Sequence, residues 1–133
     1  MNSFVGRLSQ AVEKMGLVLD DEQKQDILLY LELIQKWNKT YNITAIKDAE
    51  QILIQHLFDS LSVVLPLQQK LDPNKEAIVL DVGSGGGLPG VIIAICCPKW
   101  TVTCIDAVEK KTSIITMASG RLGLKNLRSK HCR

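Results

Sequence analysis

The sequence has no apolar run that approaches the roughly 20 residues a membrane-spanning helix needs. Its first residues, MNSFVGRLSQ, also lack the basic-then-apolar pattern of a secretory signal peptide. Cysteine is scarce: there are four, none in a C-x-x-C spacing, and three of them lie in apolar segments. We therefore expect a cytoplasmic protein with reduced, packed cysteines, no metal site and no membrane partner.

Acidic residues are almost missing from the end of the chain. Residues 108–133 contain seven Lys and Arg but a single acid, Glu109, whereas residues 1–107 contain nine basic and thirteen acidic residues. The overall net charge of +2 therefore hides a basic end of net charge +6. Such an end indicates either a polyanionic partner such as nucleic acid or a solvated helix face.

The sequence also lacks a nucleophile elbow, which leaves hydrolase chemistry with little support. His56, Asp59 and Ser60 stand at positions i, i+3 and i+4 of a predicted helix and should project from one side of it. One helix cannot easily place the histidine between the other two, as a catalytic relay requires, and the three are too few for a metal. Either His56 is hydrogen-bonded to Asp59 within the packing, or the three residues face a substrate.

The chain does contain a strand, a glycine turn and a helix start in residues 77–90, AIVLDVGSGGGLPG. The apolar run Ala77–Leu80 predicts a short buried strand that ends at Asp81 and enters a turn with glycine at 83, 85, 86, 87 and 90. Pro89 suits the first turn of a helix, which residues 91–97 continue. Because N–H groups point outward and Cβ atoms are missing, such a turn can hold the polar end of a small molecule.

Two kinds of ligand compete for this turn. The spacing Gly85-x-Gly87-x-x-Gly90 matches the dinucleotide fingerprint, but that fingerprint places its first glycine at the strand end. Counted from the strand, Asp81, Gly83, Gly85 and Gly87 resemble the first motif of S-adenosylmethionine-dependent methyltransferases. Asp81 would repel a pyrophosphate and suits a ligand with an ammonium group. The pattern therefore favours a methyltransferase over a nicotinamide dinucleotide oxidoreductase, with a purely structural glycine turn as the third reading.

A second predicted strand, residues 101–106, ends in another acid. Asp106 lies 21 residues after Gly85, at the carboxyl end of this strand, where a carboxylate can accept hydrogen bonds from both ribose hydroxyls. Its alternative role is to cap the helix that follows, residues 109–122. A strand, a crossover helix and a strand in this order form a right-handed parallel unit.

The remaining elements predict an α/β fold with an N-terminal helical region, residues 1–72, before an α/β region, residues 73–133. Gly16 and Gly123 should end helices, and Asp20 should cap one. The expected helices of the first region cover residues 4–15, 20–37 and 48–66, and a polar linker covers residues 68–76.

Two further segments shape these expectations. Residues 37–44 hold two Asn, two Thr and two aromatics, and should break the second helix as a capped turn or as a surface for a base and sugar. A third strand within residues 124–133 would complete three parallel strands in the order 3-2-1. That is half of a doubly wound sheet, with strand 1 as an exposed edge, so we expect a truncated product.

Four segments together resemble the glucose-inhibited division protein B (RsmG) family of bacterial 16S rRNA guanine-N7 methyltransferases. The match covers essentially the whole chain. Lys111 departs from the family, whose members carry Arg there more often, and a lysine weakens bidentate contact with phosphate. The segments are Trp37-Asn38-x-x-Tyr41-Asn42-Ile43-Thr44, His56-x-x-Asp59-Ser60, Asp81-Val82-Gly83-Ser84-Gly85-Gly86-Gly87-Leu88-Pro89-Gly90, and Asp106 followed by Lys110-Lys111.

The resemblance implies a partial Rossmann-like fold and methyl transfer from S-adenosylmethionine to N7 of a guanine in 16S rRNA, free or within a small-subunit particle. N7 of neutral guanine has a free lone pair, so no proton is removed and catalysis can rest on in-line positioning. By position, the implied cofactor residues are Asp81, Gly83, Ser84, Gly85, Gly87, Leu88 and Asp106, those beside the target base are Asn42, His56, Asp59 and Ser60, and those on RNA phosphates are Lys110, Lys111, Arg121, Arg128 and Arg133.

The family continues well past Arg133, so the resemblance also implies an inactive fragment. We expect such a chain to bind cofactor weakly, to lack turnover and to self-associate through its open sheet edge. Besides the oxidoreductase, a non-catalytic RNA-binding protein is the remaining alternative.

Overall fold

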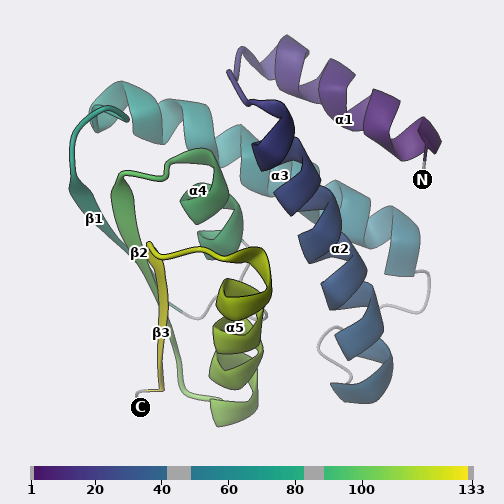
Figure 1. Ribbon diagram of the computed structural model, residues 1–133, viewed down its shortest axis with the longest axis vertical. Coiled ribbons are helices and arrows are strands. Elements are labelled where there is room, and N and C mark those ends of the chain that lie inside the picture. Colours follow the sequence, from purple (N-terminus) through teal and green to yellow (C-terminus); the bar gives the residue numbers. More distant parts are fainter. Residues whose placement is uncertain (1, 42–48, 83–88, 132–133) are drawn as a thin grey trace.

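The computed structural model describes residues 2–41, 49–82 and 89–131 of the chain. In this part the helices come first and strands then alternate with helices, in the predicted order (Figure 1). The elements are α1 (Asn2–Met15), α2 (Asp21–Tyr41), α3 (Ala49–Lys70), β1 (Ala77–Val82), α4 (Gly90–Cys96), β2 (Trp100–Asp106), α5 (Glu109–Leu122) and β3 (Leu127–His131).

The three strands form one parallel sheet with β2 in its middle. β1 pairs with β2 from Ala77 opposite Trp100 to Val82 opposite Ile105. β3 pairs with the other side of β2, starting with Leu127 opposite Val102. The predicted order 3-2-1 is therefore confirmed, and β1 is an edge strand whose far side pairs with no strand in the described part of the chain.

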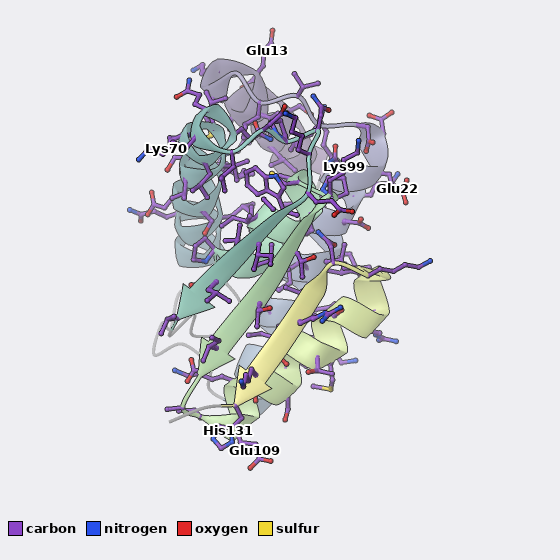
Figure 2. The ribbon with its side chains drawn as sticks, turned by 90° about the vertical axis from the view of Figure 1, so that its left-hand side faces the viewer. Glu13, Glu22, Lys70, Lys99, Glu109 and His131 are labelled. Carbon is purple, nitrogen blue, oxygen red and sulfur yellow. The ribbon has the colours of Figure 1, made fainter. Side chains whose placement is uncertain are left out.

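The helices lie on one side of this sheet, and Figure 2 shows its other face turned toward the viewer. Because side chains alternate along a strand, Trp100, Val102 and Cys104 of β2 are buried under the helices. On the opposite face, Ile78 and Leu80 of β1 are 79% and 61% exposed. The prediction of a buried first strand was thus wrong: the helix-covered face of β1 is half-buried, and the opposite face is exposed because none of the described helices covers it.

α4 is the most enclosed helix, and every one of its residues is buried. It packs on β2 on one side and on α2 and α3 on the other. Tyr30 of α2, Leu57 of α3 and Trp100 of β2 are among the largest fully buried side chains. One hydrophobic core therefore joins the N-terminal helices to the sheet.

Three of the helix boundaries that the sequence predicted are confirmed: the ends at Gly16 and Gly123 and the start at Asp20. Gly16 follows α1 with φ 76° and Gly123 follows α5 with φ 67°, a left-handed conformation that glycine adopts without steric cost. Before α2, the Gln23 N–H donates to Asp20 Oδ1 at 2.7 Å and the Asp20 N–H donates to Gln23 Oε1 at 2.9 Å. This reciprocal pair is a capping box that starts the helix.

Two helices run further than predicted. α3 does not end at Pro66 but continues to Lys70, so the first residues of the expected linker are helical. Pro66 has no N–H to donate to the carbonyl group of Ser62. Both residues are exposed, so water can bind this carbonyl group. Leu67 and Leu71, further along the chain, pack against the core. α2 continues past the predicted break at Trp37 to Tyr41, since neither glycine nor proline interrupts it.

Candidate functional site

The candidate site lies where β1 and β2 end, at the carboxyl edge of the sheet. Asp81 of β1 stands opposite Cys104 of β2, and Asp106 follows two residues further along β2. Residues 77, 79 and 81 of β1 and the buried set of β2 share the helix-covered face, so both carboxylates lie on one face of neighbouring strands. The structure thus brings together the two acids that the sequence analysis singled out.

The Asp81 carboxylate holds the start of α4. Its Oδ2 accepts a hydrogen bond of 2.9 Å from the backbone N–H of Gly90, the first residue of that helix. A carboxylate at this place satisfies an N–H that has no partner within the helix and complements the positive end of the helix dipole. Asp81 is therefore part of the scaffold as well as a candidate ligand contact.

Gly90 is required here by space. A Cβ atom at this position would lie 2.8 Å from Asp81 Oδ2 and 3.3 Å from Asp81 Cβ, and would clash with Cys104 Sγ. The glycine therefore lets the start of α4 approach both strands closely. Sequence reasoning counted Gly90 in the motif without assigning it this role, although a last glycine that allows close helix-strand packing is known from the related dinucleotide fingerprint.

Asp106 is buried, with 8% of its surface exposed, and leads into α5. Its Oδ1 accepts a hydrogen bond of 2.9 Å from the Val108 N–H, just before the helix begins at Glu109. Asp106 thus stabilises the turn before α5, but it does not cap the helix, because Val108 is the N-cap residue and no side chain makes a capping hydrogen bond there. This bond to Oδ1 is compatible with a further role at the sheet edge.

Burial and neighbouring groups shift the pKa of Asp81. Burial raises the pKa of the Asp81 carboxyl; the hydrogen bond from Gly90 lowers this pKa, and the nearby Asp106 carboxylate raises it again. Two like charges in a partly buried place favour a ligand that brings positive charge. A ligand with a pyrophosphate would add a third negative group to the same edge.

Tyr30 of α2 lies beneath this edge and was missed by sequence reasoning. Tyr30 is fully buried, and this burial raises its pKa. The nearby Cys104 and Asp81 raise this pKa further. It stands at i, i+4 and i+7 with the core residues Ile34 and Trp37, and this spacing could have revealed it as a core position. Through Tyr30 the N-terminal helices support the strand ends.

Asp59 and Ser60 were predicted to project from one side of a helix, toward the substrate. In the structure they differ in exposure. Asp59 is exposed, whereas Ser60 is buried with 6% of its surface exposed. Neighbouring residues of a helix point about 100° apart, and the packing of α3 decides which of the two meets the core. Asn42 and the side chain of His56 lie outside the described residues.

The cationic side chains predicted for RNA lie on two sides of the sheet. Arg121 is exposed at the end of α5, in the helical layer. Arg128 of β3 is also exposed, but it alternates with the buried Leu127 and so lies on the open face. Lys111 is half-buried in the first turn of α5. The side chain of Lys110 and Arg133 lie outside the described residues, as do the turn residues Gly83, Ser84, Gly85, Gly87 and Leu88.

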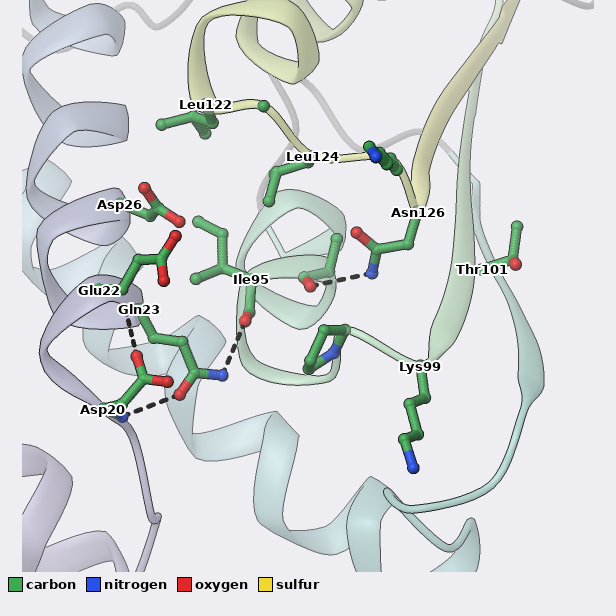
Figure 3. A pocket seen from close by; sticks show the side chains of 14 residues that line it. Asp20, Glu22, Gln23, Asp26, Ile95, Lys99, Thr101, Leu122, Leu124 and Asn126 are labelled. Atoms are coloured by element: carbon green, nitrogen blue, oxygen red, sulfur yellow. Dashed lines mark hydrogen bonds between the residues drawn. The ribbon is translucent and has the colours of Figure 1, made fainter.

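A cavity of about 460 Å³ lies far from Asp81 and Asp106, at the end of the sheet where β2 and β3 begin (Figure 3). One wall of this cavity consists of Asp20, Glu22 and Asp26. Burial raises the pKa of Asp26, and the charges of Glu22 and Asp20 raise it further. Gln23 and Asn126, which also line it, donate hydrogen bonds to carbonyl groups at the end of α4. We assign these two amides a structural role.

The described part of the chain offers neither a membrane-spanning helix nor a cluster of metal ligands. None of its helices is long and apolar enough to cross a membrane. No three His, Cys, Asp or Glu side chains there gather in a way that could hold a metal ion.

Comparison with known proteins gives a consistent family. The model of the family described as rRNA small subunit methyltransferase G (GidB) matches residues 23–133. A protein of Bordetella avium strain 197N named ribosomal RNA small subunit methyltransferase G is 55% identical over 127 residues, which is 96% of this chain and 57% of that protein. Proteins of the same name from Bordetella petrii and Acidovorax sp. strain JS42 are 53% and 46% identical, and the match covers 50% and 61% of their lengths.

The chain thus spans little more than half the length of these relatives. Among solved structures, coclaurine N-methyltransferase bound to N-methylheliamine and SAH matches 99% of this chain and 49% of its own, with 18% sequence identity and a TM-score of 0.48.

Proposed function

The chain belongs to the rRNA small subunit methyltransferase G family, and from this membership we propose that it serves the transfer of a methyl group from S-adenosylmethionine to N7 of a guanine in 16S rRNA. The structural observation that carries the proposal is the pair Asp81 and Asp106 on one face of neighbouring strand ends. S-adenosylmethionine supplies, when bound, an electrophilic methyl group on a positively charged sulfur.

The residues at the strand ends fit such a cofactor. Asp81 and Asp106 place two acidic groups where a cationic ligand with an ammonium group and a ribose would be favoured. In the proposal Asp81 faces the ammonium side and Asp106 accepts from the ribose hydroxyls, while the turn residues Gly83, Ser84, Gly85, Gly87 and Leu88 surround the cofactor. The mutual repulsion of the two acids disfavours a dinucleotide, so the nicotinamide oxidoreductase alternative is not favoured.

Methyl transfer to N7 requires that the guanine be positioned correctly, and it requires no general base. N7 of neutral guanine attacks with a free lone pair, so no proton leaves the base during transfer. We assign the positioning of the guanine to the region of Asn42, His56, Asp59 and Ser60. Of the two whose side chains the structure describes, the exposed Asp59 can meet RNA directly, and the buried Ser60 supports α3 from within.

The proposed partner is 16S rRNA, free or in a small-subunit particle. Lys110, Lys111, Arg121, Arg128 and Arg133 contact its phosphates, in keeping with the basic end of the chain. We further propose that copies of this chain associate through the free edge of β1. A non-catalytic RNA-binding protein, the remaining alternative, would have no use for an acidic pair that favours a small cationic ligand.

Calorimetric titration of the chain with S-adenosylhomocysteine and with NADH tests the cofactor. We expect S-adenosylhomocysteine to bind, weakly, and NADH not to bind. Asp106→Ala should cost about 1–3 kcal/mol of this binding, the range for losing a charged hydrogen-bond acceptor. Methyl transfer to rRNA from a strain that lacks the modification then measures turnover, which we expect to be absent for this chain by itself; binding of NADH alone would refute the proposal.

The variant Asp106→Asn tests separately whether Asp106 binds the ligand and whether it stabilises the turn before α5. Its amide oxygen can still accept from the Val108 N–H, so the start of α5 and the thermal midpoint should be preserved. The loss of charge should still weaken S-adenosylhomocysteine binding. A folded variant with unchanged affinity would leave Asp106 only its role in the turn before α5.

A further inference from the structure

His131 is the last residue of β3 and was not among the predicted site residues (Figure 2). It pairs across the sheet with Asp106, the acid that we assigned to the ribose. Earlier in β3, Leu127 is buried in the core and the Ser129 hydroxyl donates to a carbonyl group of α5. Because side chains alternate along a strand, His131 shares this helix-covered face with Leu127 and Ser129. The histidine therefore stands beside the strand end that carries Asp106.

The His131 ring is bonded to the turn between β2 and α5. Its Nε2 lies 2.9 Å from the carbonyl oxygen of Ala107. A carbonyl oxygen can only accept a hydrogen bond, so Nε2 carries a proton and donates it. In the same turn, the Val108 N–H donates to Asp106 Oδ1 at 2.9 Å. The turn is thus held by one side chain from β3 and one from β2.

These two hydrogen bonds hold a single peptide group. The carbonyl group of Ala107 and the N–H of Val108 belong to one planar unit, so a rotation of that unit disturbs both bonds at once. With its carbonyl group held by His131, the unit keeps its N–H directed at Asp106 Oδ1. The ring of His131 is therefore coupled to the orientation of the Asp106 carboxylate.

The bond from His131 contributes more to orientation than to stability. His131, Ala107 and Val108 are all exposed, so water can replace the ring on the carbonyl oxygen. The fold should therefore survive the loss of this bond, while the peptide group becomes free to rotate. A carboxylate whose partner rotates must be ordered again when a ligand binds, and this ordering costs binding free energy.

We propose that His131 is a positioning residue of the transfer reaction: through the peptide group of Ala107 and Val108 it holds the Asp106 carboxylate in the orientation that accepts the ribose hydroxyls of the cofactor. This inference rests on the proposed function, which assigns Asp106 to the ribose. In this role His131 acts on the cofactor only through Asp106.

Hydrogen exchange of the Val108 amide, followed by NMR on the full chain, tests whether His131 holds the turn. In His131→Leu this amide should exchange about threefold to tenfold faster, the range for one hydrogen bond. His131→Gln should restore slow exchange, because its amide nitrogen lies the same number of bonds from Cβ and can donate to Ala107. Lys130→Leu is the matched control, since this exposed neighbour in β3 lies on the opposite face. Unchanged exchange in His131→Leu would overturn the inference.

Calorimetric titration with S-adenosylhomocysteine tests the effect on the site. His131→Leu should weaken binding about threefold to tenfold with little change in the thermal midpoint, whereas His131→Gln and Lys130→Leu should bind as the unmodified chain does. In an Asp106→Asn background, His131→Leu should have a smaller effect, because the charge that it positions is gone. A merely structural role of His131 would instead give additive losses, which would overturn the inference.

The outcomes separate this inference from the proposed function. S-adenosylhomocysteine binding that His131→Leu leaves intact overturns the positioning role alone, and the proposed function stands. Equal losses in His131→Leu and Lys130→Leu also overturn the positioning role, because they assign the effect to β3 as a whole. No binding by the unmodified chain overturns the proposed function, and the positioning role with it.

Discussion

The Asp81 side chain both accepts a hydrogen bond at the start of α4 and has a raised pKa. Its Oδ2 holds the N–H of Gly90 at the start of α4, while burial and the neighbouring Asp106 raise its pKa. A carboxyl with a raised pKa in the folded state binds its proton more tightly there than in the unfolded chain. The charged form therefore lowers stability, and the free energy of unfolding falls as pH rises from the unfolded pKa near 3.8 through the folded pKa.

Asp81→Asn should remove this pH dependence. The amide oxygen can still accept from Gly90, so the variant should lose less stability than the unmodified chain as pH rises through that window. The lost charge should weaken S-adenosylhomocysteine binding at neutral pH. Urea unfolding at several pH values, with calorimetry at pH 7, measures both; a variant with the unmodified pH profile would show that Asp81 is not the titrating group.

Gly90→Ala should destabilise the fold by about 1–3 kcal/mol, the usual cost of overpacking. The added methyl group would press on Asp81 and Cys104, and one of the two must move. Urea unfolding measures the loss. Gly6→Ala, in open space on α1, should be neutral or slightly stabilising, and equal effects for both variants would contradict the crowding at Gly90.

At the scale of elements, α4 is held at both ends by distant parts of the chain. Asp81 serves its N-terminus, and the amides of Gln23 and Asn126 serve its last carbonyl groups (Figure 3). Asn126 Nδ2 donates to the carbonyls of Ala94, Cys97 and Trp100 at 3.0, 3.2 and 2.9 Å. Water has little access to the carbonyls at the end of a buried helix, so the side chains of Gln23 in α2 and of Asn126, just before β3, donate to them instead.

Asn126→Leu should therefore cost about 2–4 kcal/mol, because it removes these bonds and leaves partly buried carbonyls without their donor. Chemical unfolding gives the value, and far-UV circular dichroism should show whether the seven-residue helix α4 survives. Asn74→Ala, at an exposed position, is the control. A loss below about 0.5 kcal/mol would argue that water can reach the end of α4.

At the scale of the whole molecule, within the residues that the structure describes, the far edge of β1 pairs with no strand and one apolar face of the sheet has no covering helix. Ile78, Leu80 and Val82 of β1 are 79%, 61% and 75% exposed, and β1 contains neither lysine nor proline. Natural edge strands usually carry such residues, which prevent pairing with another chain. This surface is the structural basis for the proposed self-association.

Ile78→Lys with Leu80→Lys should convert an associating chain into a monomer. Size-exclusion chromatography with light scattering should show that the mass of the unmodified chain rises with concentration, and that the mass of the variant stays at about 14.7 kDa, the mass of one chain. Val18→Lys replaces a 93% exposed apolar residue outside the sheet and should not change association. A monomeric unmodified chain at all concentrations would refute self-association.

Local patterns determined much of this protein before its fold was known. The apolar run before Asp81, the glycine spacing after it and the second strand ending at Asp106 predicted a parallel sheet with two acids at one edge. Gly16, Gly123 and Asp20 marked helix ends, because caps and left-handed glycines depend on neighbours within a few residues.

Contacts between distant residues decided the rest. α3 passes Pro66 because Leu67 and Leu71 beyond it meet the core, and Ser60 is buried while Asp59 is exposed because of how α3 packs. The amide of Gln23 reaches Ile95, 72 residues later in the chain, and Gly90 is needed only because α4 meets two strands there. Such features depend on which surfaces the folded chain brings together, and local periodicity carries no information about them.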